Sequence, residues 1–275
     1  MQNAGLAALG LNWRYLAFDV PPADLAAALV GAKAMGFIGI NLTVPHKQLA
    51  LALVDELEAS GREFGAVNTV RFEGKDAGGD WQPLANFSDP PRQIRSHGFN
   101  TDADAMVRAI HEDLELDLTG TRVLLLGAGG AGRTAALKLA SAGLARMYLV
   151  NRTAARSAAV AAEIQARIPG LPLELDYPSG PVDLVMNATS LGLHPNDPLP
   201  FDEQRFSLTL AKTAFDLIYR PAETPFLQRA KAAGCRTANG LGMLLYQGAK
   251  ALEIWSGRSA PIEQMRRALE KNIYG

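Results

Sequence analysis

Apolar positions recur along the chain with two different spacings, which predicts a succession of helices and strands. Helical spacing of apolar residues predicts helices over 25–35, 47–58, 103–114, 131–142, 243–255 and 261–272. Short apolar or β-branched runs predict strands over 37–42, 67–72, 123–126, 146–150, 182–186 and 213–218. Alternation of strands and helices is typical of α/β proteins, in which helices cover a largely parallel sheet.

The strand over 123–126 leads directly into a G-x-G-x-x-G pattern, and an Ala-rich helix follows. In this pattern Gly127 is expected to make the tight turn, Gly129 to let the backbone approach phosphates, and Gly132 to let the helix pack closely on the strand. The alternative is a plain glycine-rich turn, which the flanking strand and helix disfavour. The sequence therefore predicts a site for the pyrophosphate of a dinucleotide.

The residues after the next strand bear on the choice of cofactor. NAD-binding proteins usually carry an acidic residue about 20 residues beyond the glycines, where it binds the ribose 2′-hydroxyl. Here Asn151 stands at that place, followed by Arg152 and, one helical turn on, by Arg156. Guanidinium groups bind phosphate in a fork, so the pattern favours NADP. The alternative is that both arginines are solvated residues at a helix start.

Two residues are candidates for proton transfer. Lys47 comes just after the strand over 37–42 and Pro45, and Asp102 opens the helix over 103–114, where a carboxylate is favourable. A Lys held by an Asp can give or take a proton at a substrate oxygen. An ordinary surface ion pair is the alternative.

Seven segments, taken in order and spacing, resemble those of shikimate dehydrogenases, and the resemblance spans nearly the whole chain. The segments are Asn41-Leu-Thr-Val-Pro-His-Lys47, Gly65-Ala-Val-Asn-Thr69, Gly98-Phe-Asn-Thr-Asp102, Gly127-Ala-Gly-Gly-Ala131, Asn151-Arg-Thr153, Asn187-Ala-Thr-Ser190 and Asn239-Gly-Leu-Gly-Met243. By this resemblance Lys47 and Asp102 are the catalytic pair.

The resemblance also implies which residues contact the ligands. Thr43, Asn68 and Gln247 match positions that hydrogen-bond the ring hydroxyls of the substrate, and Tyr219 matches a tyrosine near its carboxylate. The residues expected to bind NADP lie in the matching nucleotide-binding segments and are Gly127, Gly129, Gly130, Ala131, Gly132, Asn151, Arg152, Thr153, Arg156, Thr189, Ser190, Gly240 and Met243.

The implied fold is α/β with two domains. An N-terminal α/β substrate domain is expected over 1–100 and a Rossmann-type, doubly wound dinucleotide-binding domain over 101–238. C-terminal helices over 239–275 are expected to return to the first domain, and the substrate to lie in the cleft between the domains. The implied activity is the NADP-dependent interconversion of 3-dehydroshikimate and shikimate, in the chorismate pathway that leads to aromatic amino acids. The alternatives are a quinate/shikimate or aminoshikimate dehydrogenase, or a catalytically silent nucleotide-binding relative.

The chain departs from the family pattern at its start. Family members begin with a strand and a loop carrying two serines that bind the substrate carboxylate, whereas the residues from Met1 to Gly5 match the interior of the helix that follows. In the family that strand lies inside the first sheet, so a sheet without it is expected to have unpaired backbone groups. Either the protein extends upstream or another segment fills the gap.

A second departure lies between Gly74 and Gly98, where relatives make a tight hairpin. About 20 extra residues, over 75–97, are rich in Gly, Pro, Asp and Ser, and this composition predicts a surface loop. A lid over the cleft, a passive insertion, and a replacement for the missing strand and serines are the interpretations that the sequence leaves open.

Composition excludes several classes of protein. The formal net charge is -1, so nothing indicates nucleic-acid binding. The mean hydropathy is +0.02, no apolar run has the length of a membrane span, and no signal peptide is evident. The one cysteine, Cys235, predicts a buried thiol and suits a reducing cytoplasm. The four histidines show no metal-ligand spacing, so no metal site is expected. We expect a monomer or a homodimer.

Overall fold

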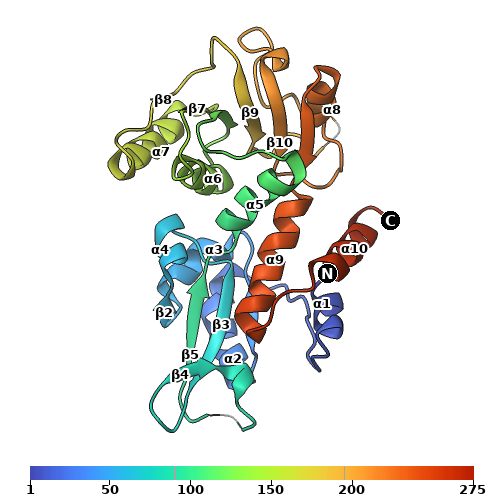
Figure 1. Ribbon diagram of the computed structural model, residues 1–275. Helices are drawn as coiled ribbons and strands as arrows, with labels where there is room; N and C mark the ends of the chain where they lie inside the picture. Colours follow the sequence, from blue (N-terminus) through green and yellow to red (C-terminus); the bar gives the residue numbers. More distant parts are fainter. Residues whose placement is uncertain (90, 195) are drawn as a thin grey trace. The chain divides into compact units, whose positions relative to one another are not determined.

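A computed structural model describes residues 1–89, 91–194 and 196–275, and the chain forms two compact units (Figure 1). Unit 1 comprises Met1–Asp102, Gln247–Ile273 and Gly275, and unit 2 comprises Ala103–Tyr246 and Tyr274. In this division the return to unit 1 comes within helix α9 (Leu241–Ser256).

Unit 1 is a small sheet with short helices. Its strands are β1 (Gly39–Asn41), β2 (Glu56–Leu57), β3 (Thr69–Lys75), β4 (Trp81–Pro83) and β5 (Ile94–Phe99). Its helices are α1 (Gln2–Ala8), α2 (Leu25–Ala34), α3 (His46–Leu49), α4 (Ala59–Phe64), α10 (Ile262–Ile273) and the second part of α9. The strand order is β1-β3-β5-β2, in which β3 pairs antiparallel with β1 and β5, and β2 pairs parallel with β5.

The predicted helix over 47–58 is wrong. Helix α3 ends at Leu49 and a 3₁₀ turn ends at Ala52. The chain then forms β2, because Asp55 exchanges hydrogen bonds with Ser96: the Asp55 N–H donates to Ser96 Oγ at 3.0 Å, and the Ser96 N–H donates to Asp55 Oδ2 at 2.7 Å. These bonds set the start of the β2–β5 pairing, and the apolar spacing of the sequence does not reveal them.

The insertion over 75–97 is not the surface loop that its composition predicts. It contains β4 and the start of β5, and it buries Leu84, which is 7% exposed and packs in the core cluster of unit 1. β1 pairs with residues 69–71 of β3, and β4 pairs with residues 73–75 of the same strand. Because β5 pairs with the opposite edge of β3, β4 and β1 lie one after the other along one edge. Residue 90 lies outside the described residues.

The insertion also does not lie where a lid would. Its residues before β5, up to residue 93, precede the N-terminal end of that strand, whereas Asp102 follows the C-terminal end (Figure 1). The six residues of β5 separate the two by about 20 Å. Of the interpretations that the sequence left open, a lid near Asp102 is disfavoured by this position.

The outer edge of β1 pairs with no strand in the described part of the chain, as expected for a sheet without the family's first strand. Residues 11–20 lie beside it without forming a strand. Side chains make the contacts: Tyr15 Oη donates to Asn41 Oδ1 at 3.0 Å, and the rings of Phe18 and Phe37 are 6.0 Å apart. Leu16 and Phe18 remain 65% and 63% exposed. The insertion does not fill this edge, because β4 pairs with β3 instead.

Unit 2 is a doubly wound parallel sheet, which confirms the predicted fold class. Its strands are β6 (Arg122–Leu126), β7 (Arg146–Val150), β8 (Leu173–Glu174), β9 (Val182–Asn187), β10 (Ala211–Asp216) and β11 (Arg236–Asn239). Its helices are α5 (Asp102–Leu114), α6 (Gly130–Ala140), α7 (Ala154–Arg167), α8 (Pro225–Ala232) and the start of α9. The strand order is β11-β10-β9-β6-β7-β8, so the chain adds β7 and β8 on one side of β6 and β9, β10 and β11 on the other. In such parallel sheets, ligands bind at the carboxyl ends of the two strands where the order reverses, here β6 and β9.

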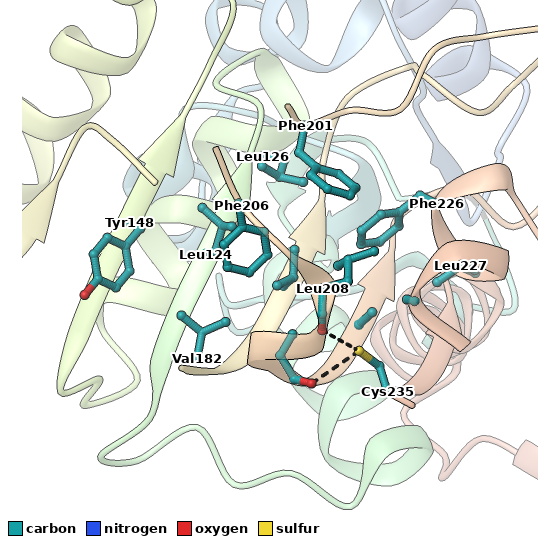
Figure 2. Close-up of a cluster of buried hydrophobic side chains, with 14 residues drawn as sticks. Leu124, Leu126, Tyr148, Val182, Phe201, Phe206, Leu208, Phe226, Leu227 and Cys235 are labelled. Carbon is teal, nitrogen blue, oxygen red and sulfur yellow. Dashed lines mark hydrogen bonds between the residues drawn. The ribbon is translucent and has the colours of Figure 1, made fainter. Parts of the chain in front are cut away.

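One core of unit 2 is rich in phenylalanine (Figure 2). Phe201 and Phe226 pack edge to face with ring centroids 6.3 Å apart, against Leu124 and Leu126 of the central strand. Cys235 is 6% exposed, and its thiol donates to the carbonyl oxygens of Leu208 and Ala211. The prediction of a buried thiol is thus confirmed.

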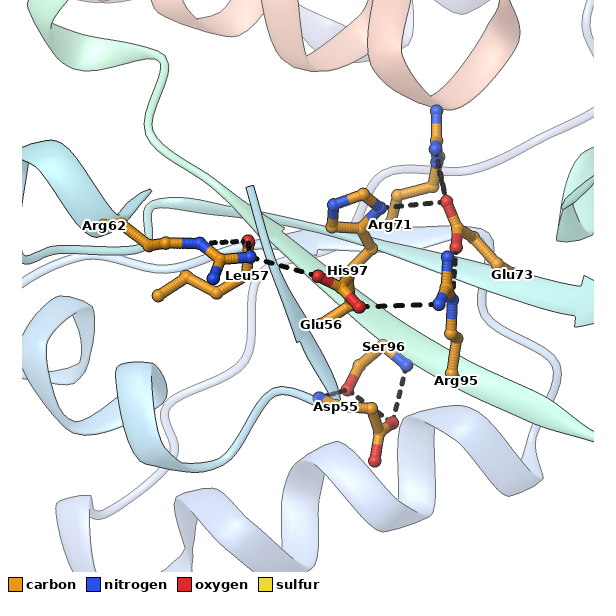
Figure 3. Close-up of polar contacts among 9 residues, drawn as sticks. All are labelled: Asp55, Glu56, Leu57, Arg62, Arg71, Glu73, Arg95, Ser96 and His97. Atoms are coloured by element: carbon orange, nitrogen blue, oxygen red, sulfur yellow. Dashed lines mark hydrogen bonds and ion pairs between the residues drawn. The ribbon is translucent and has the colours of Figure 1, made fainter. Parts of the chain in front are cut away.

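One face of the sheet in unit 1 carries a buried charge cluster (Figure 3). The Glu73 side chain is 2% exposed and accepts from Arg71 and from Arg95 Nε at 2.7 Å, while His97 Nδ1 lies 3.0 Å from its Oε1. Burial alone raises the pKa of Glu73, but hydrogen bonds from His97, Arg71 and Arg95 outweigh it and lower that pKa from 4.5 to about 2. The carboxylate therefore joins strands β3 and β5 through its charge.

We predict that Glu73→Gln lowers the free energy of unfolding of unit 1 by about 2–3 kcal/mol near neutral pH, because the two arginines lose their partner. The contribution of the carboxylate is complete above pH about 4.5 and is lost as the pH falls towards about 2, since its pKa is lowered in the folded state. All three tryptophans, Trp13, Trp81 and Trp255, belong to unit 1, so urea unfolding followed by tryptophan fluorescence reports on this unit.

The matched control is Glu56→Gln, because Glu56 is 40% exposed in the same cluster and should change stability by no more than about 0.5 kcal/mol. Equal effects of the two variants, or an acid transition of unit 1 that persists unchanged in Glu73→Gln, would contradict the prediction.

Candidate active site

Lys47 and Asp102 form the ion pair expected from the sequence. Lys47 Nζ lies 2.7 Å from Asp102 Oδ2, and the two side chains are 26% and 13% exposed. Lys47 is in α3 just after β1, and Asp102 is the first residue of α5 just after β5. The pair is thus a charge-assisted hydrogen bond at the ends of two strands that both pair with β3.

A buried network next to this pair holds Asn68 and Thr101. Asn68 Nδ2 donates to Thr101 Oγ1 at 3.0 Å, and the Thr101 N–H donates to Asn68 Oδ1 at 2.9 Å. Both residues are buried, and Thr101 Oγ1 is also 3.1 Å from the carbonyl oxygen of Gln247. Asn100 Oδ1 accepts from the Asp102 N–H at 3.0 Å. The backbone that leads to Asp102 is therefore held by the Asn68 side chain, directly before β3, and the Thr101 side chain is held by a backbone carbonyl oxygen of α9.

Several residues of this network, among them Asn41, Thr101 and Tyr15, were not assigned a role from the sequence. Asn41 Nδ2 donates to Thr69 Oγ1 at 3.0 Å and to the carbonyl oxygen of Asn68, and Tyr15 Oη donates to Asn41 Oδ1. Asn41 opens the first motif and Thr101 precedes Asp102, so both had a signal in the sequence. Tyr15 had none, because its contact with Asn41 depends on the fold.

The other substrate residues are placed as follows. Thr43 is exposed in the turn after β1, and its carbonyl oxygen accepts from the His46 N–H at 2.8 Å. Gln247 is half-buried where α9 enters unit 1. Lys47, Asp102, Asn68, Thr43 and Gln247 thus all belong to unit 1. Tyr219 belongs to unit 2, where it is half-buried after β10 and its carbonyl oxygen accepts from Tyr274 Oη.

The glycine turn of unit 2 has the geometry that its sequence predicts. Gly127 has a φ of +110°, which glycine alone adopts easily. A Cβ added at Gly132 would lie 2.3 Å from the carbonyl oxygen of Gly127. The close packing of the helix on the turn therefore leaves no room for a side chain at this position. A Cβ at Gly129 or Gly130 would meet no atom within 4 Å, and Ala131 is exposed. Open space therefore lies at the N-terminus of α6, where backbone N–H groups are free to bind an anion.

The residues after β7 divide into two groups. Asn151 uses its side chain within the protein: Oδ1 accepts from the Ala128 N–H at 3.0 Å and Nδ2 donates to the carbonyl oxygen of Thr153. Arg152 and Arg156 are exposed, and neither side chain has a hydrogen bond or ion pair with the residues that the structure describes. Two uncommitted cations beside the glycine turn are what a 2′-phosphate needs.

The loops after β9 and β10 complete this edge of the sheet. Asn187 Oδ1 accepts from the N–H and the hydroxyl of Thr189, and Ser190 is exposed beside it. The Gly240 N–H donates to the carbonyl oxygen of Ile218. A Cβ added at Gly240 would lie 2.1 Å from the carbonyl oxygen of Leu217. Met243, in the first turn of α9, is half-buried.

The cofactor residues predicted from the sequence follow strands of one sheet or lie at the start of α6, α7 and α9. They fit a dinucleotide because they offer open space at a helix N-terminus and two uncommitted arginines. Within residues 1–89, 91–194 and 196–275, no group of three or more His, Cys, Asp or Glu could hold a metal ion, and no helix is long and apolar enough to cross a membrane.

Comparisons with known proteins agree on one family. Residues 1–70 match the shikimate dehydrogenase substrate binding domain, residues 108–191 match shikimate / quinate 5-dehydrogenase, and residues 240–270 match the shikimate 5′-dehydrogenase C-terminal domain. A shikimate dehydrogenase (NADP(+)) of Methanopyrus kandleri is 38% identical over 283 residues, which cover 99% of this chain and 90% of the relative.

Two solved structures show how far the likeness extends. Shikimate 5-dehydrogenase from Thermus thermophilus, in complex with NADP(H) and shikimate, is similar with a TM-score of 0.78 at 35% identity, over 98% of this chain and 92% of that chain. The ligand-free 5-ketofructose reductase of a Gluconobacter species is similar with a TM-score of 0.80 at 35% identity and the same coverage. Enzymes named for different substrates thus share this fold.

We predict that Gly129→Ala weakens NADP⁺ binding by at least about tenfold while leaving thermal unfolding nearly unchanged. The added methyl group would enter space that no protein atom occupies but that a pyrophosphate needs. Gly132→Ala is the informative contrast, because its methyl group would overlap Gly127 and should destabilise unit 2 by about 1–3 kcal/mol. Calorimetry with and without NADP⁺ measures both quantities, and unchanged affinity in Gly129→Ala would place the pyrophosphate elsewhere.

Proposed function

The chain belongs to the shikimate dehydrogenase family, and on this premise we propose that it interconverts 3-dehydroshikimate and shikimate as an NADP-dependent oxidoreductase. The observation that carries the proposal is the Lys47–Asp102 pair at 2.7 Å, formed in the same protein as a glycine turn flanked by two uncommitted arginines. The first supplies proton transfer and the second a dinucleotide site. A carbonyl–alcohol interconversion requires both.

Lys47 acts as the general acid and base at the reacting oxygen of the substrate. Its ammonium group donates a proton to the C3 oxygen as a carbonyl becomes an alcohol and takes one back in the reverse direction. Asp102 keeps the ammonium at one place, because the α5 start that carries it is fixed by Asn100. When bound, the nicotinamide of NADP supplies or accepts the hydride.

The remaining polar groups of unit 1 bind the rest of the substrate. The Asn68 side chain and the Gln247 backbone are both hydrogen-bonded to Thr101, so ring hydroxyls that bind to Asn68 and Gln247 meet residues held in a fixed arrangement. Thr43 and Thr101 add hydroxyls to the same set. On unit 2, we assign Tyr219 to the substrate carboxylate, as in the family pattern.

Binding of the cofactor is assigned to the strand ends of unit 2. The N-terminus of α6, from Gly130 to Gly132, binds the pyrophosphate, and Arg152 and Arg156 bind the 2′-phosphate. Asn151 contributes by holding the glycine turn in place. The loops with Thr189, Ser190, Gly240 and Met243 are assigned to the nicotinamide half.

The assay that tests the proposal mixes the protein with NADP⁺ and shikimate and follows NADPH by its absorbance. Quinate and aminoshikimate replace shikimate in parallel reactions, and 5-ketofructose with NADPH tests the activity for which the Gluconobacter enzyme is named. Turnover of shikimate with the largest kcat/KM supports the proposal. A better rate with another compound reassigns the substrate, and no turnover with any compound, together with NADP⁺ binding, identifies a silent nucleotide-binding relative.

We also propose that the protein works in the reducing cytoplasm as a monomer or a homodimer. The single cysteine, buried and hydrogen-bonded, supports the first part. Light scattering after gel filtration, with and without NADP⁺, measures the mass in solution.

We predict that Lys47→Ala lowers kcat by about 100-fold or more, because the positioned proton donor is removed, with little change in Tm. Lys33→Ala is a matched control: Lys33 pairs with Asp55 at 2.5 Å, and its side chain is also 26% exposed. Steady-state kinetics of both variants decides the point. A Lys47→Ala enzyme with kcat within about twofold of the control would remove Lys47 from the mechanism.

We predict that Arg152→Ala raises the KM for NADP⁺ much more than the KM for NAD⁺, by about tenfold or more, because only NADP⁺ carries the 2′-phosphate. Arg167→Ala is the control, since Arg167 ends α7, the helix that follows Arg152, but pairs with Glu163. If Arg152→Ala changes both KM values equally, Arg152 does not select the cofactor, and the same measurement on Arg156→Ala locates the selector.

A further inference from the structure

Asp216, the last residue of β10, is a fully buried carboxylate that no assigned step uses. It accepts three hydrogen bonds: Oδ2 from Thr224 Oγ1 at 2.6 Å, and Oδ1 from the Ile218 N–H and from Asn187 Nδ2, both at 3.0 Å. Burial raises the pKa of Asp216, and these three donors oppose the rise. Among the residues that the structure describes, no cation pairs with Asp216, so burying its charged form has a free-energy cost.

On one side Asp216 orients the loop after β9. Asn187 Nδ2 donates both to Asp216 and to the carbonyl oxygen of Leu191, which fixes the amide so that its Oδ1 points to Thr189. Thr189 then donates through its N–H and its hydroxyl, and its Oγ1 accepts from the Leu191 N–H at 3.1 Å. The shape of the loop that carries Thr189 and Ser190 thus depends on Asp216 through one amide.

On the other side Asp216 orients the loop after β10. It accepts from the Ile218 N–H, while the carbonyl oxygen of Ile218 accepts from the Gly240 N–H. Gly240 is packed so closely on Leu217 that a Cβ there would lie 2.1 Å from the Leu217 oxygen. Tyr219 and Gly240 are therefore placed by the same carboxylate that sets the Thr189 loop.

These loops lie on one side of the sheet's reversal point. The adenosine end of a dinucleotide belongs at β7, where Arg152 and Arg156 lie, and the pyrophosphate at the N-terminus of α6. The other half of the molecule then extends over the ends of β9 and β10, where Asp216 lies. In the described part of the chain, Asp216 makes no hydrogen bond to Gly127–Gly132 or Asn151, although Thr189 lies next to Gly127.

We propose that Asp216 is a positioning residue that sets the nicotinamide half of the NADP site and leaves the adenosine half unaffected. The proposal rests on the proposed function, because it takes NADP as the ligand. A carboxylate is needed at this place because all three neighbouring groups are donors. The Ile218 N–H and Asn187 Nδ2, one from each loop, both donate to Oδ1, and the Thr224 hydroxyl donates to Oδ2. An amide at residue 216 removes the negative charge that strengthens the two bonds at Oδ1 and presents a donor to Thr224, so the hold on both loops weakens.

The test compares two ligands by calorimetry: NADP⁺, and 2′-phosphoadenosine 5′-diphosphoribose, which lacks the nicotinamide. Asp216→Asn is expected to weaken NADP⁺ binding by about tenfold and to change binding of the fragment by less than about twofold. It should also lower kcat, because a misplaced ring reacts slowly. Asp183→Asn is the matched control, since Asp183 lies on β9 but binds Lys212 and the Arg122 N–H at the other end of the sheet.

Thr224 gives a second, milder variant pair. Thr224→Val removes the hydroxyl bonded to Asp216 Oδ2 and should move the two affinities in the same selective way, whereas Thr224→Ser keeps the hydroxyl and should restore NADP⁺ binding. If Asp216→Asn does not fold, this pair decides the proposal. Equal weakening of NADP⁺ and the fragment, or no weakening of either, overturns it. An unaltered protein that binds neither ligand overturns the proposed function instead, so the two failures are distinguishable.

Discussion

The ion pair between Lys47 and Asp102 sets the main requirement on unit 1, because a partly buried lysine needs a carboxylate at hydrogen-bonding distance. The two residues are far apart in the sequence and meet only because β1 and β5 pair with opposite edges of β3. Asn68, at the start of β3, then bonds to Thr101 beside Asp102, so the central strand positions both partners and stabilises the backbone between them. The sheet of unit 1 is small, but the register of its strands determines that Lys47 and Asp102 meet.

In unit 2, too, side chains at the ends of strands hold the neighbouring backbone in place, here through two neutral amides and one carboxylate. Asn151, Asn187 and Asp216 each stand at or directly after the end of a strand, and each binds backbone groups of a neighbouring loop. Parallel strands carry their backbone partners only along their length, so loops at their ends depend on side chains for order. The three residues together order the turns at the strand ends, while the side chains of Arg152 and Arg156 have no hydrogen-bond or ion-pair partner among the residues that the structure describes.

The sequence predicted the features that depend on local rules. The glycine turn, strands β6, β7, β9 and β10 and the buried Cys235 follow from residue type and spacing, whereas β8 and β11 were not predicted. Gly127 has the positive φ that its pattern implies. The sequence failed where a distant partner decides the structure: Ser96 turns the expected helix at 55–57 into strand β2, and β3 takes β4 as a further partner. Tyr15 was missed for the same reason, because only the fold brings it to Asn41.

The position of the insertion shows why the active site tolerates the extra length. Residues added between β3 and β5 extend the hairpin at the end of the sheet away from Asp102, and β4 pairs with β3 beyond the last residue that β1 uses. The added segment buries Leu84 and places Trp81 against Arg95, with the guanidinium carbon 4.6 Å from the ring centroid, so it supplies its own contacts. It shares no strand pairing with the backbone that leads to Lys47. Growth at one end of a sheet can therefore proceed without changing the register that brings Lys47 and Asp102 together at the other end.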